Sequence, residues 1–323
     1  MAQCNGILPV RLPEAPTAAG DFMSLRVVAG GALALLVSVV SVPSAALVFS
    51  AAQANERVVY VSAWNEKTRA PITDAGVDAF AVKEDGRARE ILRVSPATSP
   101  MPIAILVDNS QAARNHITEI RRALTSFVRA VEGVGPISII GIADRPTIFA
   151  DYSTDLKLID AGIGKVFAMP GSGATLLDAI VEVSKGLGKR EEDRAAIVVL
   201  TTENVEFSTR HYQDVLEELR KGGAQLHAVI LNTPAGASLS DESRNRASVL
   251  DRGPRESGGT RVDVLASQAF QTKMLELAAI LKSQHRVVYA RPESLIPPEK
   301  IEVSATKPTV EASGSPARGQ KAK

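Results

Sequence analysis

The residues with the clearest chemical potential in this sequence follow a short apolar run. Ile103 to Val107 are apolar without interruption, and Asp108, Asn109 and Ser110 come directly after them. An unbroken run of this kind is typical of a strand that is buried on both faces of a parallel sheet. A carboxylate and a hydroxyl at its end could bind a divalent cation, or they could cap the helix that follows.

Two other stretches place polar residues where a helix begins or a strand ends. Residues 171–175 form a loop with glycine and serine in front of an apolar helix pattern. Residues 195–200 form a second wholly apolar run, which ends in Thr201-Thr202-Glu203. In open α/β sheets, ligand sites form outside the carboxyl ends of the strands. We therefore expect the loops 108–112, 171–175 and 201–205 to meet on one rim of the sheet.

The elements that must position these loops predict an α/β fold, with a doubly wound, mostly parallel sheet preceded by a small antiparallel β unit. Strand-like and helix-like segments alternate across 101–290, as such a sheet requires. Residues 55–95 have the pattern of antiparallel strands, with Glu84-Asp85-Gly86 as a hairpin turn. Three further expectations concern a polar loop with a mobile tip at 232–255, a C-terminal β segment at 291–305 and a disordered tail at 306–323.

The N-terminal residues 1–54 have the pattern of a secretory signal peptide. Arg26 precedes an apolar stretch, and Ala52-Gln53-Ala54 supplies a cleavage site in front of Asn55. The alternative is an uncleaved signal anchor, because residues 27–52 are long enough to span a bilayer. Met23 is a second candidate start. We expect a secreted protein, or one of the periplasm or cell envelope. Membrane contact is expected only if the segment stays uncleaved.

The charge, aromatic content and cysteine count of the chain limit the classes of partner that it could bind. The formal net charge is +1 and aromatic residues make up 4% of the chain, which disfavours nucleic-acid binding. The single cysteine, Cys4, lies in the predicted signal peptide, so the mature chain has no disulfides or cysteine metal sites. An exported chain without disulfides is common in bacterial envelopes. A bacterial source fits these features best.

Patterns typical of several enzymes are missing from the sequence. It has no G-x-S-x-G elbow and no G-x-x-x-x-G-K-[ST] loop. Haloacid-dehalogenase-like phosphatases need a second aspartate two residues after the first, where this chain has Ser110. The four histidines are dispersed and lack H-E-x-x-H spacing.

Taken together, the motifs resemble the von Willebrand factor A (VWA) domain, and more narrowly a bacterial secreted VWFA-related group, over about residues 55–304. That group has a D-F-x-V-x-E-D-G pattern before the A domain, and Asp78 to Gly86 are close to it. Gly258-Gly259 and Gln284 to Tyr289 correspond to its late Gly-Gly and its Q-Y-x-x-x-Y-like ending.

The resemblance implies a metal-ion-dependent adhesion site with D-x-S-x-S, a loop threonine and a further aspartate as its residues. Asp108, Ser110 and Thr175 match three of these positions. Ala112 replaces the second serine and Thr202 replaces the aspartate. Losing a carboxylate and a hydroxyl should weaken Mg²⁺ binding considerably. We expect no cofactor, with Mg²⁺ as the alternative.

Two functions remain open. The resemblance implies an exported, non-catalytic protein-binding module for adhesion or assembly, with a weakened or lost divalent-metal site. Its partner-binding rim would consist of Asn109, Gln111, Ser172, Gly173 and Glu203. The alternative is a hydrolase or phosphatase-like enzyme that uses Asp108.

Overall fold

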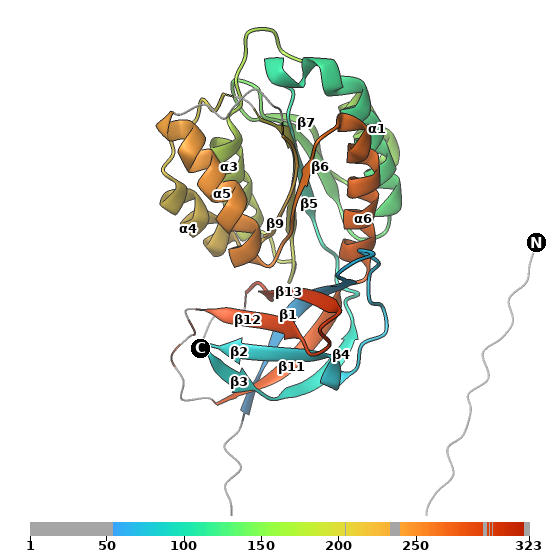
Figure 1. The fold of residues 1–323 in the computed structure, drawn as a ribbon, viewed down its shortest axis with the longest axis vertical. Helices are drawn as coiled ribbons and strands as arrows, with labels where there is room; N and C mark the ends of the chain where they lie inside the picture. Colours follow the sequence, from blue (N-terminus) through green and yellow to red (C-terminus); the bar gives the residue numbers. More distant parts are fainter. Residues whose placement is uncertain are drawn as a thin grey trace, which may run out of the picture. The chain divides into compact units, whose positions relative to one another are not determined.

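The α/β part of the chain is built on a six-stranded sheet with helices on both faces (Figure 1). The computed structural model describes residues 54–203, 205–232, 240–292, 296, 298 and 300–319. The segment to which we assign the signal peptide lies outside these residues, apart from Ala54. No helix in the described part of the chain is both long and apolar enough to cross a membrane.

The sheet has the strand order β10-β9-β8-β5-β6-β7, and all neighbours are parallel except β7, which is antiparallel to β6. Its strands are β5 (Ile103–Val107), β6 (Ile137–Gly141), β7 (Thr147–Ser153), β8 (Ala196–Thr202), β9 (Gln225–Leu231) and β10 (Arg261–Val264). The chain runs outward from β5 to β7 and then returns to build the other half from β8. The expected doubly wound, mostly parallel sheet is therefore confirmed, and its order reverses between β5 and β8.

Two helical layers cover this sheet, and each is held by its own apolar core. In Figure 1, α1 and α6 lie on one face and α3, α4 and α5 on the other. The helices are α1 (Ile117–Ala130), α2 (Leu156–Gly164), α3 (Leu176–Gly188), α4 (Tyr212–Gly222), α5 (Asp241–Ser257) and α6 (Phe270–Lys282). Short 3₁₀ turns are η1 (Val77–Ala79), η2 (Gln111–His116) and η3 (Ser267–Ala269). Because β5, β6, β8 and β9 are buried on both faces, their side chains serve both cores.

The antiparallel part consists of two sheets that share one core. The strand orders are β13-β1-β11-β4 and β12-β2-β3. The strands are β1 (Ala54–Asn65), β2 (Phe80–Glu84), β3 (Arg87–Arg89), β4 (Ile91–Pro96), β11 (His285–Pro292), β12 (Ile301–Ala305) and β13 (Val310–Pro316). Val59 and Tyr289 from the first sheet pack with Phe80 and Val82 from the second.

This arrangement corrects two expected boundaries. The β unit is not confined to 55–95, because β11, β12 and β13 complete it. Strand β11 crosses the expected domain end at residue 290 and pairs with β1 and β4 instead of joining the parallel sheet. A strand flanked by two antiparallel neighbours buries its backbone groups as fully as one in the parallel sheet would, so local pattern could not decide between the two.

The disordered tail expected at 306–323 is wrong for most of its length. Strand β13 pairs with β1 from Val59↔Pro316 to Asn65↔Val310. Val310 and Ala312 alternate toward the core of the β unit, and a Cβ at Gly314 would lie 2.5 Å from the Val303 side chain. The Pro, Ser, Gly and Lys content of this segment masks the alternation of core-facing and outward-facing residues along β13. This alternation lets β13 pair with the otherwise unpaired edge of β1.

The polar loop expected at 232–255 is also wrong, because most of it is helix α5. Ser240 is the N-cap, and its hydroxyl accepts a hydrogen bond from the Ser243 N–H at 3.2 Å. Asp241 and Glu242 stand in the first turn, where the positive end of the helix dipole favours acidic residues. Gly258 closes the helix with φ 78° in the left-handed region. Residues 233–239 of the expected loop lie outside the described part of the chain.

Candidate functional site

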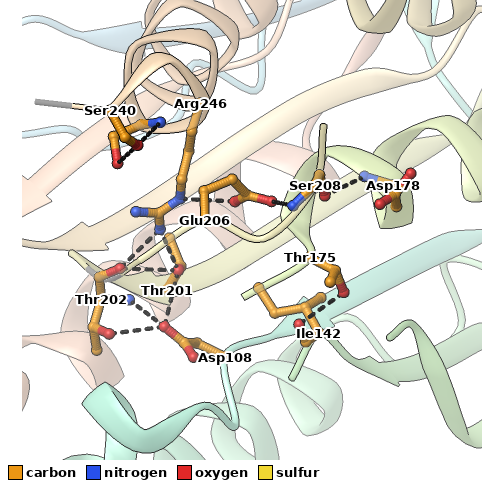
Figure 2. A network of polar contacts seen from close by, with 11 residues as sticks. Asp108, Ile142, Thr175, Asp178, Thr201, Thr202, Glu206, Ser208, Ser240 and Arg246 are labelled. Carbon is orange, nitrogen blue, oxygen red and sulfur yellow. Dashed lines mark hydrogen bonds and ion pairs between the residues drawn. The ribbon is translucent and has the colours of Figure 1, made fainter. Parts of the chain in front are cut away.

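The candidate site lies at the carboxyl ends of β5 and β8, where the strand order reverses. Its centre is the Asp108 carboxylate, which is completely buried. Asp108 Oδ2 accepts hydrogen bonds from Thr202 Oγ1 at 2.7 Å, from the Thr202 N–H at 2.9 Å and from Thr201 Oγ1 at 3.1 Å (Figure 2). Asp108 Oδ1 accepts from the Ser110 N–H at 2.9 Å. Both carboxylate oxygens are therefore engaged by the protein.

The alternative role expected for Asp108 and Ser110, capping of the helix that follows them, is found only in part. The bond from the Ser110 N–H closes a local turn at Asp108. Ser110 is the N-cap residue of η2, but its side chain makes no capping hydrogen bond. Asp108 instead joins β5 to β8, so its role reaches across the sheet.

A buried arginine from α5 supplies the positive charge of this cluster. Arg246 is 6% exposed, and its Nη2 donates to Thr201 Oγ1 and to the Thr202 carbonyl, both at 2.8 Å. The Thr201 hydroxyl thus lies between the guanidinium, from which it accepts, and the Asp108 carboxylate, to which it donates. Figure 2 shows Arg246 reaching from α5 onto the two threonines.

Glu206 lies on the other side of the same guanidinium. Its Oε2 is 3.5 Å from Arg246 Nε, and neither atom has a hydrogen-bond partner within the described residues. Its Oε1 accepts from the Ser208 N–H at 3.2 Å. Burial raises the pKa of Glu206 to about 7, against the lowering effects of Ser208 and Arg246. Burial lowers the pKa of Arg246, but Glu206, Asp108 and Glu203 oppose that shift, and a guanidinium stays charged in proteins.

Thr175 lies on the neighbouring loop, but its hydroxyl is turned to another group. Thr175 Oγ1 donates to the Ile142 carbonyl at 3.0 Å, and the Thr175 N–H donates to the same oxygen at 2.7 Å (Figure 2). The Ile142 N–H in turn donates to the Val107 carbonyl, one residue before Asp108. The loops therefore come together, and the Thr175 hydroxyl is bonded to the backbone of Ile142.

The five residues expected to contact a partner differ in exposure. Asn109 and Ser172 are buried, and their side chains hold the rim: Asn109 Oδ1 accepts from the Ala143 N–H at 2.9 Å, and Ser172 Oγ donates to the Met169 carbonyl at 2.7 Å. Gly173 is buried, and a Cβ there would lie 2.7 Å from the Phe207 ring. Glu203 is partly buried. Gln111 is exposed, and its Oε1 accepts from the Gly171 N–H at 3.2 Å. Close packing of the loops covers Asn109, Ser172 and Gly173 in this conformation, so that Gln111 and Glu203 are the more accessible of the five.

The rim also exposes four large apolar side chains, which the sequence reasoning missed. These side chains and their exposed fractions are Phe167 (63%), Met169 (44%), Val205 (54%) and Phe207 (50%). We call these four residues the rim patch. Backbone bonds place them on the site loops, since the Met169 N–H donates to the Asn109 carbonyl and the Ala174 N–H to the Val205 carbonyl. The sequence does show large apolar residues within segments that are expected to be loops. Such residues can indicate an interaction surface when they lie together.

The arginine and glutamate of the cluster were also missed. Arg246 belongs to the segment expected to be a loop, so its burial was not considered. One signal could have found it: Arg246, Val249, Leu250 and Gly253 recur at the spacing of one helix face, and all four are buried. Glu206 follows the strand end at Thr202 without any local pattern.

Among the described residues, no group of three or more His, Cys, Asp or Glu side chains could hold a metal ion. The positions that the resemblance assigns to a metal offer few oxygens. Ala112 has none in its side chain, and Thr202 Oγ1 already donates to Asp108. Two of the positions that the resemblance assigns to metal ligands, Asp108 and Thr202, are thus bonded to each other.

Comparison with known proteins shows likeness in fold at low sequence identity. No protein-family model matches the chain, and no curated protein matches its sequence. An aerotolerance-related membrane protein from Bacteroides fragilis is 16% identical, with 55% of this chain and 98% of that chain covered and a TM-score of 0.44. BatB from Bacteroides thetaiotaomicron is 15% identical, with coverage of 56% and 99% and a TM-score of 0.44.

A von Willebrand factor type A structure from Catenulispora acidiphila is 8% identical, covers 83% of this chain and 64% of that chain, and has a TM-score of 0.46. VWA domains are thus among the structures that this chain resembles in fold. At these identities the likeness concerns the path of the chain, and what this protein binds has to be inferred from its own residues.

Proposed function

We propose that this protein is an exported, non-catalytic module of the VWA type that binds a protein partner through the rim of its six-stranded sheet, without a metal ion. One observation carries the proposal. The polar centre of the rim is closed by internal bonds to Asp108, while the loops around it expose the rim patch.

The absence of a metal requirement rests on the donor set. Mg²⁺ prefers six oxygens, commonly with one or two carboxylates and several waters. Here Asp108 is the carboxylate that matches the metal-ligand pattern, and both of its oxygens already accept hydrogen bonds. Arg246 adds a fixed positive charge that a cation would have to approach. The residues present therefore do not fit a divalent ion.

The choice of a protein partner rests on the rim patch. Contiguous exposed apolar patches mark interaction sites on protein surfaces. Phe167 also lies under the guanidinium of Arg121, whose Cζ is 4.0 Å from the ring centroid, which gives this end of the patch an aromatic face with a cation beside it. Aromatic residues and arginine are enriched in protein interfaces.

The hydrolase or phosphatase alternative would need Asp108 to reach a substrate. A nucleophile or general base must come within hydrogen-bond distance of the reacting atom. The Asp108 carboxylate has no exposed surface and is held by Ser110, Thr201 and Thr202. This arrangement supports the binding module over the enzyme.

Export rests on the signal-peptide pattern of residues 1–54. N-terminal sequencing of the protein from a native bacterial envelope fraction tests it. We expect the mature chain to begin at Asn55, and a chain that retains residues 27–52 would establish the anchored alternative.

Metal independence is tested by thermal unfolding of the full chain with EDTA and with millimolar Mg²⁺. We expect the Tm to be the same in both. A saturable rise in Tm with Mg²⁺ that the Asp108→Asn variant lacks would contradict the proposal.

Partner binding is tested by affinity capture from envelope extract, followed by identification and reconstitution with the purified partner. The variant Met169→Glu/Val205→Glu places charges in the rim patch, and Leu158→Glu/Leu275→Glu is the matched control on α2 and α6, where both leucines are exposed. We expect the first variant to lose reconstituted binding and the control to keep it, in EDTA as in Mg²⁺. Equal binding by both variants would refute the assignment of the rim.

A further inference from the structure

A pocket lies at the opposite edge of the six-stranded sheet from the rim. It has a volume of about 460 Å³, within the range of sites that hold small molecules. The C-terminal ends of α3 and α4 form one side of it, at Gly188 and Gly223, and strands β1 and β11 form another, at Arg57 and Tyr289. Helices that return between parallel strands end at the amino edge of the sheet, so this pocket is separate from the candidate site.

The lining of this pocket is basic. Three acidic side chains, Glu84, Glu191 and Glu192, face twice as many basic ones. The basic residues are Arg57, Arg190, Arg220, Lys221, Arg291 and Arg318. If all are charged, the lining carries a surplus of three positive charges, although the whole chain has a formal net charge of only +1.

Part of this charge is already balanced inside the β unit. Glu84 is 2% exposed, and its Oε2 lies 3.1 Å from Arg291 Nε and 2.9 Å from Arg89 Nε. Its Oε1 accepts from the Tyr289 hydroxyl at 2.9 Å. Arg57 stands directly opposite Tyr289 in the β1–β11 register. The Arg57 side chain makes no hydrogen bond or ion pair within the described residues, and its Nε is buried.

The helix ends use two more of the basic side chains. Arg318 donates to the Leu187 carbonyl at the end of α3, to the Arg190 carbonyl at 3.3 Å and to the Glu192 carbonyl at 3.2 Å. Arg190 pairs with Glu192 at 2.7 Å. Arg318 therefore covers carbonyls that would otherwise repel an anion. The side chain of Arg220, on the last turn of α4, makes no hydrogen bond or ion pair in the described part of the chain.

We propose that this pocket binds a small polyvalent oxyanion, a molecule with at least two phosphate or carboxylate groups. Arg57 and Arg220 enter the pocket from two different elements, and neither side chain is hydrogen-bonded within the described residues. A planar guanidinium binds phosphate or carboxylate oxygens through paired N–H groups. Two open guanidiniums and the surplus charge suit a ligand with more than one anionic group.

Isothermal titration of the full chain at physiological ionic strength tests this proposal, with inorganic pyrophosphate and citrate as probes. The test variant is Arg57→Gln/Arg220→Gln. The matched control, Arg87→Gln/Lys189→Gln, removes the same charge from exposed positions outside the pocket. We expect saturable binding of one probe or both, weakened at least tenfold in the test variant and less than twofold in the control. Stronger binding of pyrophosphate assigns a phosphate ligand, and stronger binding of citrate assigns a polycarboxylate.

Equal weakening in both variants would overturn the proposal, because it would reduce binding to general charge attraction. The absence of saturable binding of either probe would overturn it too. Sedimentation with phosphatidylglycerol vesicles completes the test. Vesicle binding that pyrophosphate does not compete with, together with no binding of free pyrophosphate, would assign the basic residues to a membrane surface and refute the pocket. The thermal unfolding curve of each variant establishes that it is folded.

Discussion

Replacing Glu206 with glutamine tests how charge is arranged in the buried cluster. The carboxylate is 3.5 Å from Arg246 Nε without a hydrogen bond, so the attraction of the pair does not offset the loss of water around the carboxylate. Burial therefore raises the pKa of Glu206 from 4.5 to about 7. A raised pKa in the folded state means that the native protein holds this proton more tightly than the unfolded chain does.

The sign of the pH effect follows from that difference. Stability from the protonated carboxyl is fully present below the unfolded pKa of 4.5 and is lost as the pH rises through about 7. The full difference corresponds to about 3 kcal/mol, and about 2.5 kcal/mol of it falls between about pH 5 and about pH 8. Glutamine has the shape of the protonated carboxyl and does not ionise. Glu206→Gln should therefore gain about 2.5 kcal/mol relative to the wild type over that interval.

Urea unfolding of both proteins at the two pH values measures this change as a difference, so titration of other groups cancels. Glu182→Gln, an exposed glutamate on α3, is the control and should show no pH-dependent difference. A variant that becomes less stable relative to the wild type as the pH rises would refute the reasoning. That result would mean that the ionised pair with Arg246 outweighs desolvation.

Three further outcomes are expected. Arg246→Met should lower the free energy of unfolding by about 3–5 kcal/mol in urea titrations, because it leaves Asp108 and the Thr202 carbonyl without their buried cation; a loss below about 1 kcal/mol would contradict this role. Burial lowers the pKa of His227 to about 3, so the neutral ring stabilises the fold above the unfolded pKa of 6.5. The free energy of unfolding should fall by about 4 kcal/mol as the pH falls to about 3, and His227→Gln should abolish this pH dependence. Gly259→Ala should cost about 3 kcal/mol or more by thermal unfolding, since its Cβ would lie 1.9 Å from the Leu226 carbonyl oxygen, whereas Gly164→Ala, with open space around it, should change the Tm little.

The strands that position the site could be predicted because their signal is local. Residues 103–107 and 196–200 are apolar without alternation, and burial on both faces of a parallel sheet requires just that. The meeting of their polar ends followed from a property of all open α/β sheets. The sequence thus predicted which loops come together, with Asp108 beside Thr201 and Thr202.

What those loops do with their side chains could not be predicted, because the partners are distant in sequence. Arg246 reaches Thr201 from a helix 45 residues later, and that helix was hidden by its polar composition. Arginine side chains are also usually exposed, so a buried arginine is not expected from sequence alone. Strand β13 was hidden in a similar way, since the edge that it completes belongs to β1, at the other end of the chain.

The position of the positive charge decides how this rim can recognise a partner. A metal ion on a rim offers its charge to solvent, so that a partner carboxylate can complete the coordination sphere. Arg246 is 6% exposed, and its guanidinium donates to Thr201 and Thr202. Its positive charge therefore interacts with groups inside the protein and is not presented to a partner. Under the proposed function, recognition then comes from the rim patch, whose burial is an apolar process. Binding of that kind depends weakly on ionic strength and has a negative change in heat capacity, whereas recognition through a metal-bound carboxylate would weaken with salt.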